Sequence, residues 1–94
     1  QEIRIFPIQK VKDTENAFQF SWQHVGSATG YKLELMFDGE TSFFAYIDAS
    51  HNAYITPPWI GEKIVEGTQN QDHNILQWRI QALDKNGVAY RMSK

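Results

Sequence analysis

Alternation of apolar and polar residues in three segments constrains the fold of this chain more than any other feature. In each segment the apolar side chains fall on every second residue, which is typical of a β-strand with one buried face. The segments are residues 18–22, 31–37 and 76–82. We therefore expect three strands that share one core. The expected core residues are Phe18, Phe20, Trp22, Tyr31, Leu33, Leu35, Leu76, Trp78 and Ile80.

Four weaker β-rich segments lie between these strands and at the ends of the chain. Pro7 in the first of them favours a sheet edge or a strand end. The pairs Asp38-Gly39 and Asn86-Gly87 are signals for tight hairpin turns. About seven short strands separated by turns predict an all-β, antiparallel sandwich. The four weaker segments are residues 2–8, 41–47, 52–56 and 88–92.

Residues 57–74 interrupt this pattern. The second half of the segment is polar and predicts an exposed loop. The first half has two interpretations. Thr56 is a candidate N-cap for a short helix with Pro57 at its first position and Gly67 just past its end. Alternatively, the β-branched residues of this half suit an irregular or extended run.

Length and charge limit the domain organisation and the partners of the chain. Its 94 residues fit one domain, 1–94, which can stabilise a core without cross-links. The absence of cysteine excludes disulfides and thiolate metal sites. A net charge of −2 with no basic run argues against nucleic acid, and no apolar stretch is long enough for membrane insertion. The chain begins at Gln1 without a signal-like segment, so either processing removed one or, as we prefer, this is a domain excised from a larger protein.

Two stretches resemble fibronectin type III domains. In that family a tryptophan ends strand B, a loop of small residues follows and a tyrosine begins strand C. In FSWQHVGSATGYKLEL, these places are taken by Trp22, residues 26–30 and Tyr31. WRIQALDKNG is similar to strand F and the F–G turn, most closely to bacterial versions with a Trp-Arg pair. The resemblance covers most of the chain and implies a seven-stranded immunoglobulin-like sandwich, with strands A, B and E facing strands C, C′, F and G.

The chain also departs from the family. Leu76 stands where the family often has the tyrosine of the tyrosine corner, so the hydrogen bond of that tyrosine is absent. The E–F connection is long, about 18 residues (57–74), and no Arg-Gly-Asp tripeptide occurs. The resemblance therefore implies a fold without implying a particular ligand.

Trp78 and Arg79 are adjacent and look like a binding site, but they fall on opposite faces of one expected strand. Trp78 belongs to the alternating set, so we expect it in the core against Trp22, with ligand contact as the alternative. Arg79 faces outward and is expected near Glu34 or Lys32 of a neighbouring strand.

The candidate contact residues are aromatic and lie outside the core set: Trp59, Tyr54, Tyr46 and Phe44. Trp59 follows a double proline. Either it folds down with Ile60 to plug one end of the sandwich, which we prefer, or it contacts a partner or a glycan. Phe43, Phe44 and Tyr46 share one strand, so one of its faces must look outward. We expect residues 57–66 to cover that strand, with a partner contact as the alternative.

Neither a metal site nor catalysis is expected. His24, His51 and His73 are isolated and lack the spacing of metal ligands. The carboxylates fall mostly in turns, and no nucleophile motif or phosphate-binding glycine loop occurs. The sequence therefore predicts no catalytic, cofactor-binding or metal-binding residues.

The expected function is that of a non-catalytic accessory or interaction module in a larger extracytoplasmic bacterial protein, whether periplasmic, cell-surface or secreted. Such a module spaces or docks neighbouring domains or binds a protein partner. One alternative is a carbohydrate-binding module that holds a polysaccharide on aromatic residues around Trp59. Another is a module that self-associates through an aromatic edge strand.

Overall fold

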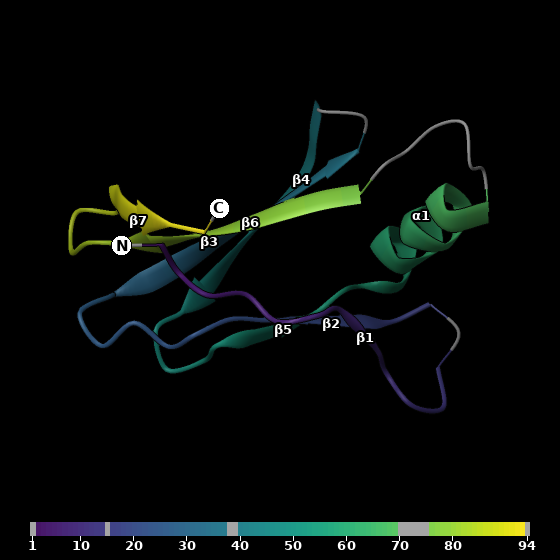
Figure 1. The fold of residues 1–94 in the computed structure, drawn as a ribbon, viewed down its shortest axis with the longest axis horizontal. Helices are drawn as coiled ribbons and strands as arrows, with labels where there is room; N and C mark the ends of the chain where they lie inside the picture. Colours follow the sequence, from purple (N-terminus) through teal and green to yellow (C-terminus); the bar gives the residue numbers. More distant parts are fainter. Residues whose placement is uncertain (1, 15, 38–39, 70–75, 94) are drawn as a thin grey trace.

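A computed structural model describes residues 2–14, 16–37, 40–69 and 76–93, which form two antiparallel sheets and one helix (Figure 1). The first sheet has three strands in the order β1-β2-β5, and the second has four in the order β4-β3-β6-β7. The alternation therefore predicted the β-sandwich architecture correctly. The elements are β1 Gln9–Lys10, β2 Phe18–Ser21, β3 Gly30–Phe37, β4 Glu40–Asp48, β5 Ala53–Ile55, α1 Pro58–Gln69, β6 Leu76–Leu83 and β7 Ala89–Met92.

The core lies between the inner faces of the two sheets. Of the nine expected core residues, six are fully buried and three are half-buried against them. The three half-buried residues are Phe18, Leu76 and Trp78. Ile60 and Ile64 of α1 complete one end of the core, which strand alternation alone does not predict.

The core aromatic rings pair across the layers in a different way from the expected one. Trp78 meets Phe20 edge-on with ring centroids 5.0 Å apart, and Trp22 meets Tyr31 at 5.4 Å. The expected contact between Trp78 and Trp22 is wrong. Trp22 lies two residues beyond Phe20, and this places it nearer to Tyr31 than to Trp78. Tyr31 pairs with Ala82, whereas Trp78 pairs with Leu35 near the other end of β3.

The N-terminal segment departs from the expected strand at 2–8. The first strand is β1, at Gln9–Lys10, after Pro7. Ahead of it the chain crosses from one sheet to the other: Ile3 bridges Ser93 beyond β7, and Ile5 bridges Trp22 beyond β2. Proline has no N–H to donate to a ladder, and Pro7 lies between these isolated bridges and β1.

The helical interpretation of the segment after β5 is correct, but the expected cap is not. The Pro57 carbonyl accepts hydrogen bonds from the N–H groups of Ile60 and Gly61, at 3.1 and 3.0 Å, so Pro58 takes the first helical position. Thr56 is buried, and its Oγ1 accepts a hydrogen bond from the Phe18 N–H at 3.1 Å. The threonine therefore joins β5 to β2. The helix continues past Gly67 to Gln69.

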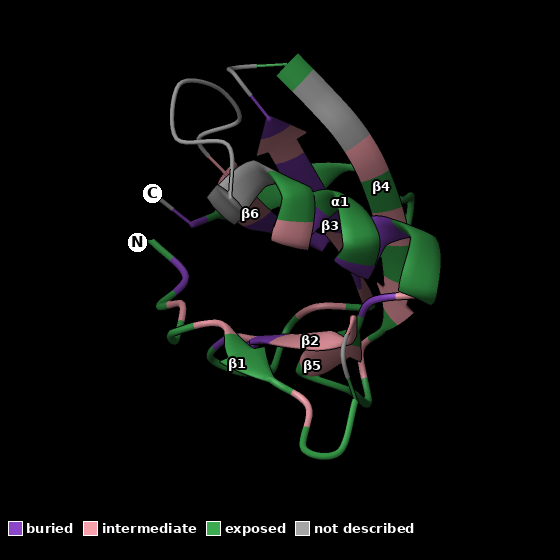
Figure 2. Ribbon diagram, turned by 90° about the vertical axis from the view of Figure 1, so that its right-hand side faces the viewer, coloured by how far each residue is buried: buried purple, intermediate pink, exposed green. Residues whose placement is uncertain are grey.

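Helix α1 closes one end of the sandwich. Figure 1 shows it at one end of the two sheets, and Figure 2 shows it in front of the four-stranded sheet, facing the three-stranded sheet below. Ile60 and Ile64 lie one helical turn apart and point into the core, where both are buried. Gly61 lies so close to the β1–β2 connection that a Cβ there would overlap the backbone carbonyl of Asn16.

The two hairpin signals have different outcomes. Asn86-Gly87 joins β6 to β7 as predicted, with Gly87 at a φ of 78° and the Asp84 carboxylate accepting from the Asn86 and Val88 N–H groups. The expected turn at Asp38-Gly39 lies outside the described residues. The expectation of a polar loop in the second half of 57–74 is wrong as far as Gln69, where α1 ends, and residues 70–74, with His73, lie outside the described residues.

The close approach at Gly61 predicts that Gly61→Ala destabilises the fold by roughly 2–4 kcal/mol, because a backbone carbonyl must move. Helix propensity alone predicts the opposite effect of Gly61→Ala, an increase of about 1 kcal/mol in the free energy of unfolding. Urea unfolding measures the difference. The matched control is Gly26→Ala, where a Cβ meets nothing within 4 Å and we expect a change below about 0.5 kcal/mol. Equal stability of the two variants would contradict this docking of α1.

Candidate contact surface at the β4 edge

Strand β4 differs from the other edge strands in its length. It has nine residues, whereas β1, β5 and β7 have two, three and four. Long exposed edges are usually protected by charge, proline or bulges. Residues 41–47 contain neither charge nor proline, and the register shift against β3 falls at Leu35/Met36, so pairing from Phe43 to Asp48 is regular. Among the described strands, only β3 pairs with β4, which leaves the other side of β4 without a strand partner.

The outer face of β4 carries two exposed aromatic rings. Phe44 and Tyr46 are 50% and 71% exposed, and they pair in register with Glu34 and Lys32 of β3. The Lys32 ammonium lies 4.3 Å from the centroid of the Phe44 ring, within the range of a cation–π contact. This face therefore combines apolar rings with a positive charge.

The inner face of β4 is joined to the other sheet and to α1 by Phe43. The Phe43 ring lies 6.2 Å from Tyr54 of β5 and meets Trp59 of α1 edge-on at 5.5 Å. Trp59 is nevertheless 62% exposed. Burial raises the pKa of the Tyr54 phenol above its ordinary value. The three rings form a partly exposed aromatic cluster at the side of the sandwich.

The four expected contact residues therefore fall into two groups, one on each side of β4. Phe44 and Tyr46 lie outside, and Trp59 and Tyr54 meet around Phe43. The expectation that residues 57–66 cover β4 is wrong for the outer face, because successive strand residues point to opposite faces and α1 reaches only the inner one. The plug interpretation holds for Ile60, which is buried, and is wrong for Trp59.

Phe43 was not among the expected contact residues, although it links the inner cluster. The segment 41–47 is apolar on both faces, so alternation alone did not assign its inward side. The half-buried series Phe43, Ala45 and Ile47 identifies that side in the structure. Phe43, Ala45 and Ile47 are spaced two residues apart and therefore share one face of the strand. Only the pairing with β3 shows that this face is the inner one.

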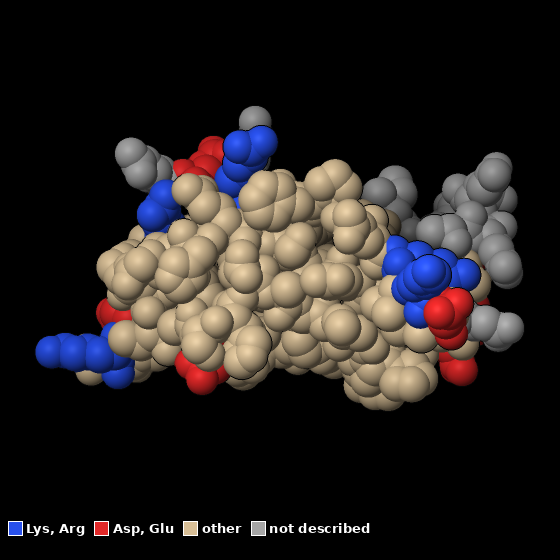
Figure 3. Space-filling view, turned by 90° about the horizontal axis from the view of Figure 1, so that it is seen from below, with Lys and Arg blue, Asp and Glu red and all other residues tan. Residues whose placement is uncertain are grey.

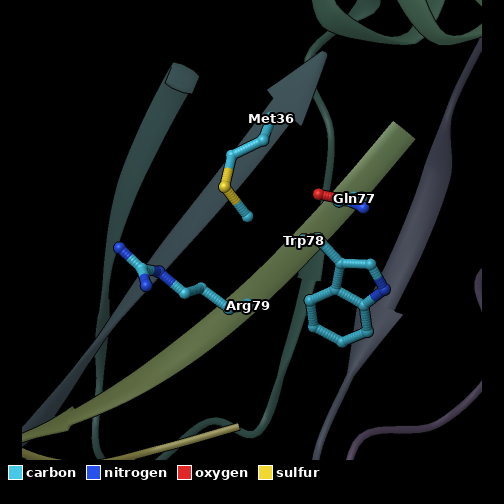
Figure 4. A pocket seen from close by; sticks show the side chains of 4 residues that line it. All are labelled: Met36, Gln77, Trp78 and Arg79. Atoms are coloured by element: carbon cyan, nitrogen blue, oxygen red, sulfur yellow. The ribbon is translucent and has the colours of Figure 1, made fainter. Parts of the chain in front are cut away.

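A second feature lies on the outer face of the four-stranded sheet, around Arg79. Its Nη2 donates to Oε2 of Glu34 at 3.2 Å, which confirms the expected neighbour, but the Glu34 side chain is only 5% exposed. A pocket of about 450 Å³ adjoins this pair and is lined by Met36, Gln77, Trp78 and Arg79. Figure 4 shows Met36 and Arg79 on one side of the sheet and the Trp78 ring on the other. The polar side chains among the lining residues are those of Gln77 and of Arg79, which already pairs with Glu34.

The histidines and carboxylates that the structure describes are dispersed. Nδ1 of His24 lies 3.4 Å from the Tyr31 hydroxyl, and His51 contacts the neighbouring Ser50. Within residues 2–14, 16–37, 40–69 and 76–93, no three His, Cys, Asp or Glu side chains gather as metal ligands would. In the same part of the chain, no helix has the length and apolar character needed to cross a membrane.

Comparison of the chain with protein-family models, with curated proteins and with solved structures finds no match.

The burial of Tyr54 predicts a pH dependence. A phenol whose folded-state pKa is raised contributes stability below its unfolded pKa of about 10, and this contribution is lost as pH rises through the folded value. The difference between absorbance titrations of the wild type and Tyr54→Phe isolates this group, and its midpoint should lie above about 10. In the same pH range, the free energy of unfolding should fall more steeply with rising pH for the wild type than for Tyr54→Phe. A midpoint at or below the ordinary value would contradict the burial.

Proposed function

We propose that this chain is a fibronectin type III-like, non-catalytic interaction module of a larger extracytoplasmic bacterial protein. In this proposal the module docks or spaces neighbouring domains or binds a protein partner. The observation that carries it is the β4 edge, where a long strand without charge or proline from 41 to 47 is flanked by exposed aromatic side chains. Aromatic residues are enriched in protein interfaces, and an open edge adds backbone donors and acceptors.

The strand order supports the family part of the proposal. A three-stranded sheet β1-β2-β5 beside a four-stranded sheet β4-β3-β6-β7 corresponds to strands A, B and E beside C′, C, F and G. Trp22 and Tyr31, two residues that carry the resemblance, contact each other in the core. The bacterial and extracytoplasmic setting rests on the sequence resemblance alone.

A second surface suits the docking of a neighbouring domain. Figure 3 shows the molecule from the side of the three-stranded sheet, with charged side chains gathered toward the two ends and an uncharged area between them. In this sheet Gln19 pairs with Ile55 and Ser21 pairs with Ala53, and none of these four residues is charged. Burying such a face requires the desolvation of few charges, which lowers the cost of contact.

Photo-crosslinking in the parent protein tests the proposal. With p-benzoyl-phenylalanine in place of Phe44, we expect a discrete crosslinked product in cells, because this exposed ring would lie in the interface. The matched control carries the same group in place of Val88, which is 58% exposed in the β6–β7 turn. Equal products at both positions, or none at either, would count against an interface at β4.

A carbohydrate-binding module is the second candidate, favoured by the exposure of Trp59 beside Phe43 and Tyr54. Aromatic side chains supply large apolar surfaces for ligand contact. If this function holds, Trp59→Ala should weaken binding to one polysaccharide by roughly tenfold or more. Affinity electrophoresis measures this without relying on the tryptophan signal that the variant removes. Tyr90→Ala, at an exposed ring on β7, is the control, and unretarded migration of the wild type across a polysaccharide panel would remove the candidate.

A further inference from the structure

The charge distribution along β4 limits what can pair with it. Glu40 and Asp48 stand at its two ends, and residues 41–47 between them are uncharged. A strand of the same sequence running antiparallel with Phe44 as its centre would place Glu40 opposite Asp48, and opposed like charges are destabilising. Moving the centre by one residue to Ala45 removes this opposition. Asp48 then lies opposite Ser42, and Glu40 lies beyond the paired strand.

The register centred on Ala45 also matches the aromatic residues to one another. Phe44 of one copy falls opposite Tyr46 of the other, and Tyr46 opposite Phe44, so two aromatic cross-strand pairs form on the outer face. On the inner face, Ile47 of the second copy falls opposite Phe43, the residue that contacts the exposed Trp59. One register therefore covers the exposed rings on both sides of β4.

We propose that two copies of this chain associate by antiparallel pairing of their β4 strands about a two-fold axis at Ala45. This inference rests on the proposed interaction function and names its partner, a second copy. The pairing joins the two four-stranded sheets into one continuous sheet of eight strands and satisfies the backbone groups at the open edges.

The surface available at this edge sets the strength of the association. Phe44, Tyr46 and Trp59 are 50%, 71% and 62% exposed. At about 150–250 Å² for each aromatic side chain, covering these rings in both copies removes roughly 550–900 Å² from solvent. Together with the strand edges, this area falls in the range of weak, transient interfaces, below about 1,200 Å². The dimer is therefore reversible and depends on concentration.

Sedimentation velocity over about a hundredfold range of concentration tests the pairing. The mean mass of the wild type should rise toward that of a dimer. Tyr46→Glu should remain monomeric at every concentration, because it introduces a charge into the pairing strand. The side chain is 71% exposed and in register with Lys32, so the variant should fold normally, which its circular dichroism and urea unfolding verify. The matched control is Val88→Glu in the β6–β7 turn, at a position that is 58% exposed and outside both proposed surfaces, and it should associate like the wild type.

A single introduced cysteine tests the register. The chain has no native cysteine, so Ala45→Cys forms a disulfide only between copies. Directly opposed residues of antiparallel strands lie about 4.5–5.5 Å apart between Cα atoms, within the range of a disulfide. Under mild oxidation Ala45→Cys should crosslink much faster than Val88→Cys, at an exposed position outside both proposed surfaces. Equal rates would overturn the pairing at this register.

Two further outcomes overturn the inference: a wild-type chain that is monomeric throughout the range, and association that Tyr46→Glu leaves unchanged. Neither by itself removes the proposed interaction function. If the wild type is monomeric but position 44 crosslinks to a different protein, the proposed interaction function stands and that protein is the partner at β4. If no position on β4 crosslinks to any protein, the interaction function proposed for β4 fails as well.

Discussion

Two edge-to-face aromatic contacts between the layers, Phe20 with Trp78 and Trp22 with Tyr31, hold the sheets together and determine how they face each other. Such pairs contribute about 0.5–1.5 kcal/mol beyond the burial of their area. The polar end of Tyr31 is also satisfied, because its hydroxyl accepts a hydrogen bond from the Val25 N–H at 2.8 Å. The same tyrosine therefore secures the β2–β3 connection, and β3 positions β4 and β6 on its two sides.

The aromatic contacts leave one end of the sandwich to be closed by another element. Helix α1 does so with Ile60 and Ile64, and its close approach to the β1–β2 connection explains a glycine inside the helix, where glycine is otherwise unfavourable. Because Ile60 points into the core, its neighbour Trp59 is carried to the surface beside Phe43. The exposure of Trp59 thus follows from the way the helix is docked.

The same arrangement makes β4 both a structural liability and a candidate interface. A long edge strand without charge or proline is prone to pair with another strand, and most proteins protect such edges. The other three edge strands here are short, and β5 is followed by two prolines. Among the described strands, only β4 combines an open, regular edge with exposed rings on the strand and on the adjacent helix.

The sequence by itself determined the strands with one buried face. Alternation in β2, β3 and β6 identified most of the core, and the Asn86-Gly87 pair identified a turn, because both signals depend on the local geometry of the backbone. The family resemblance also placed Arg79 near Glu34 or Lys32 of a neighbouring strand, and the structure shows that the partner is Glu34.

Only the tertiary structure decided which face of β4 looks outward, how the core rings pair, and that Ile60 is buried while Trp59 is exposed. These outcomes depend on residues distant in the sequence, such as Phe43 with Tyr54 or Gly61 with Asn16. A segment that is apolar on both faces carries no periodic signal for such contacts, so its environment is set by the packing of the sheets and the helix around it.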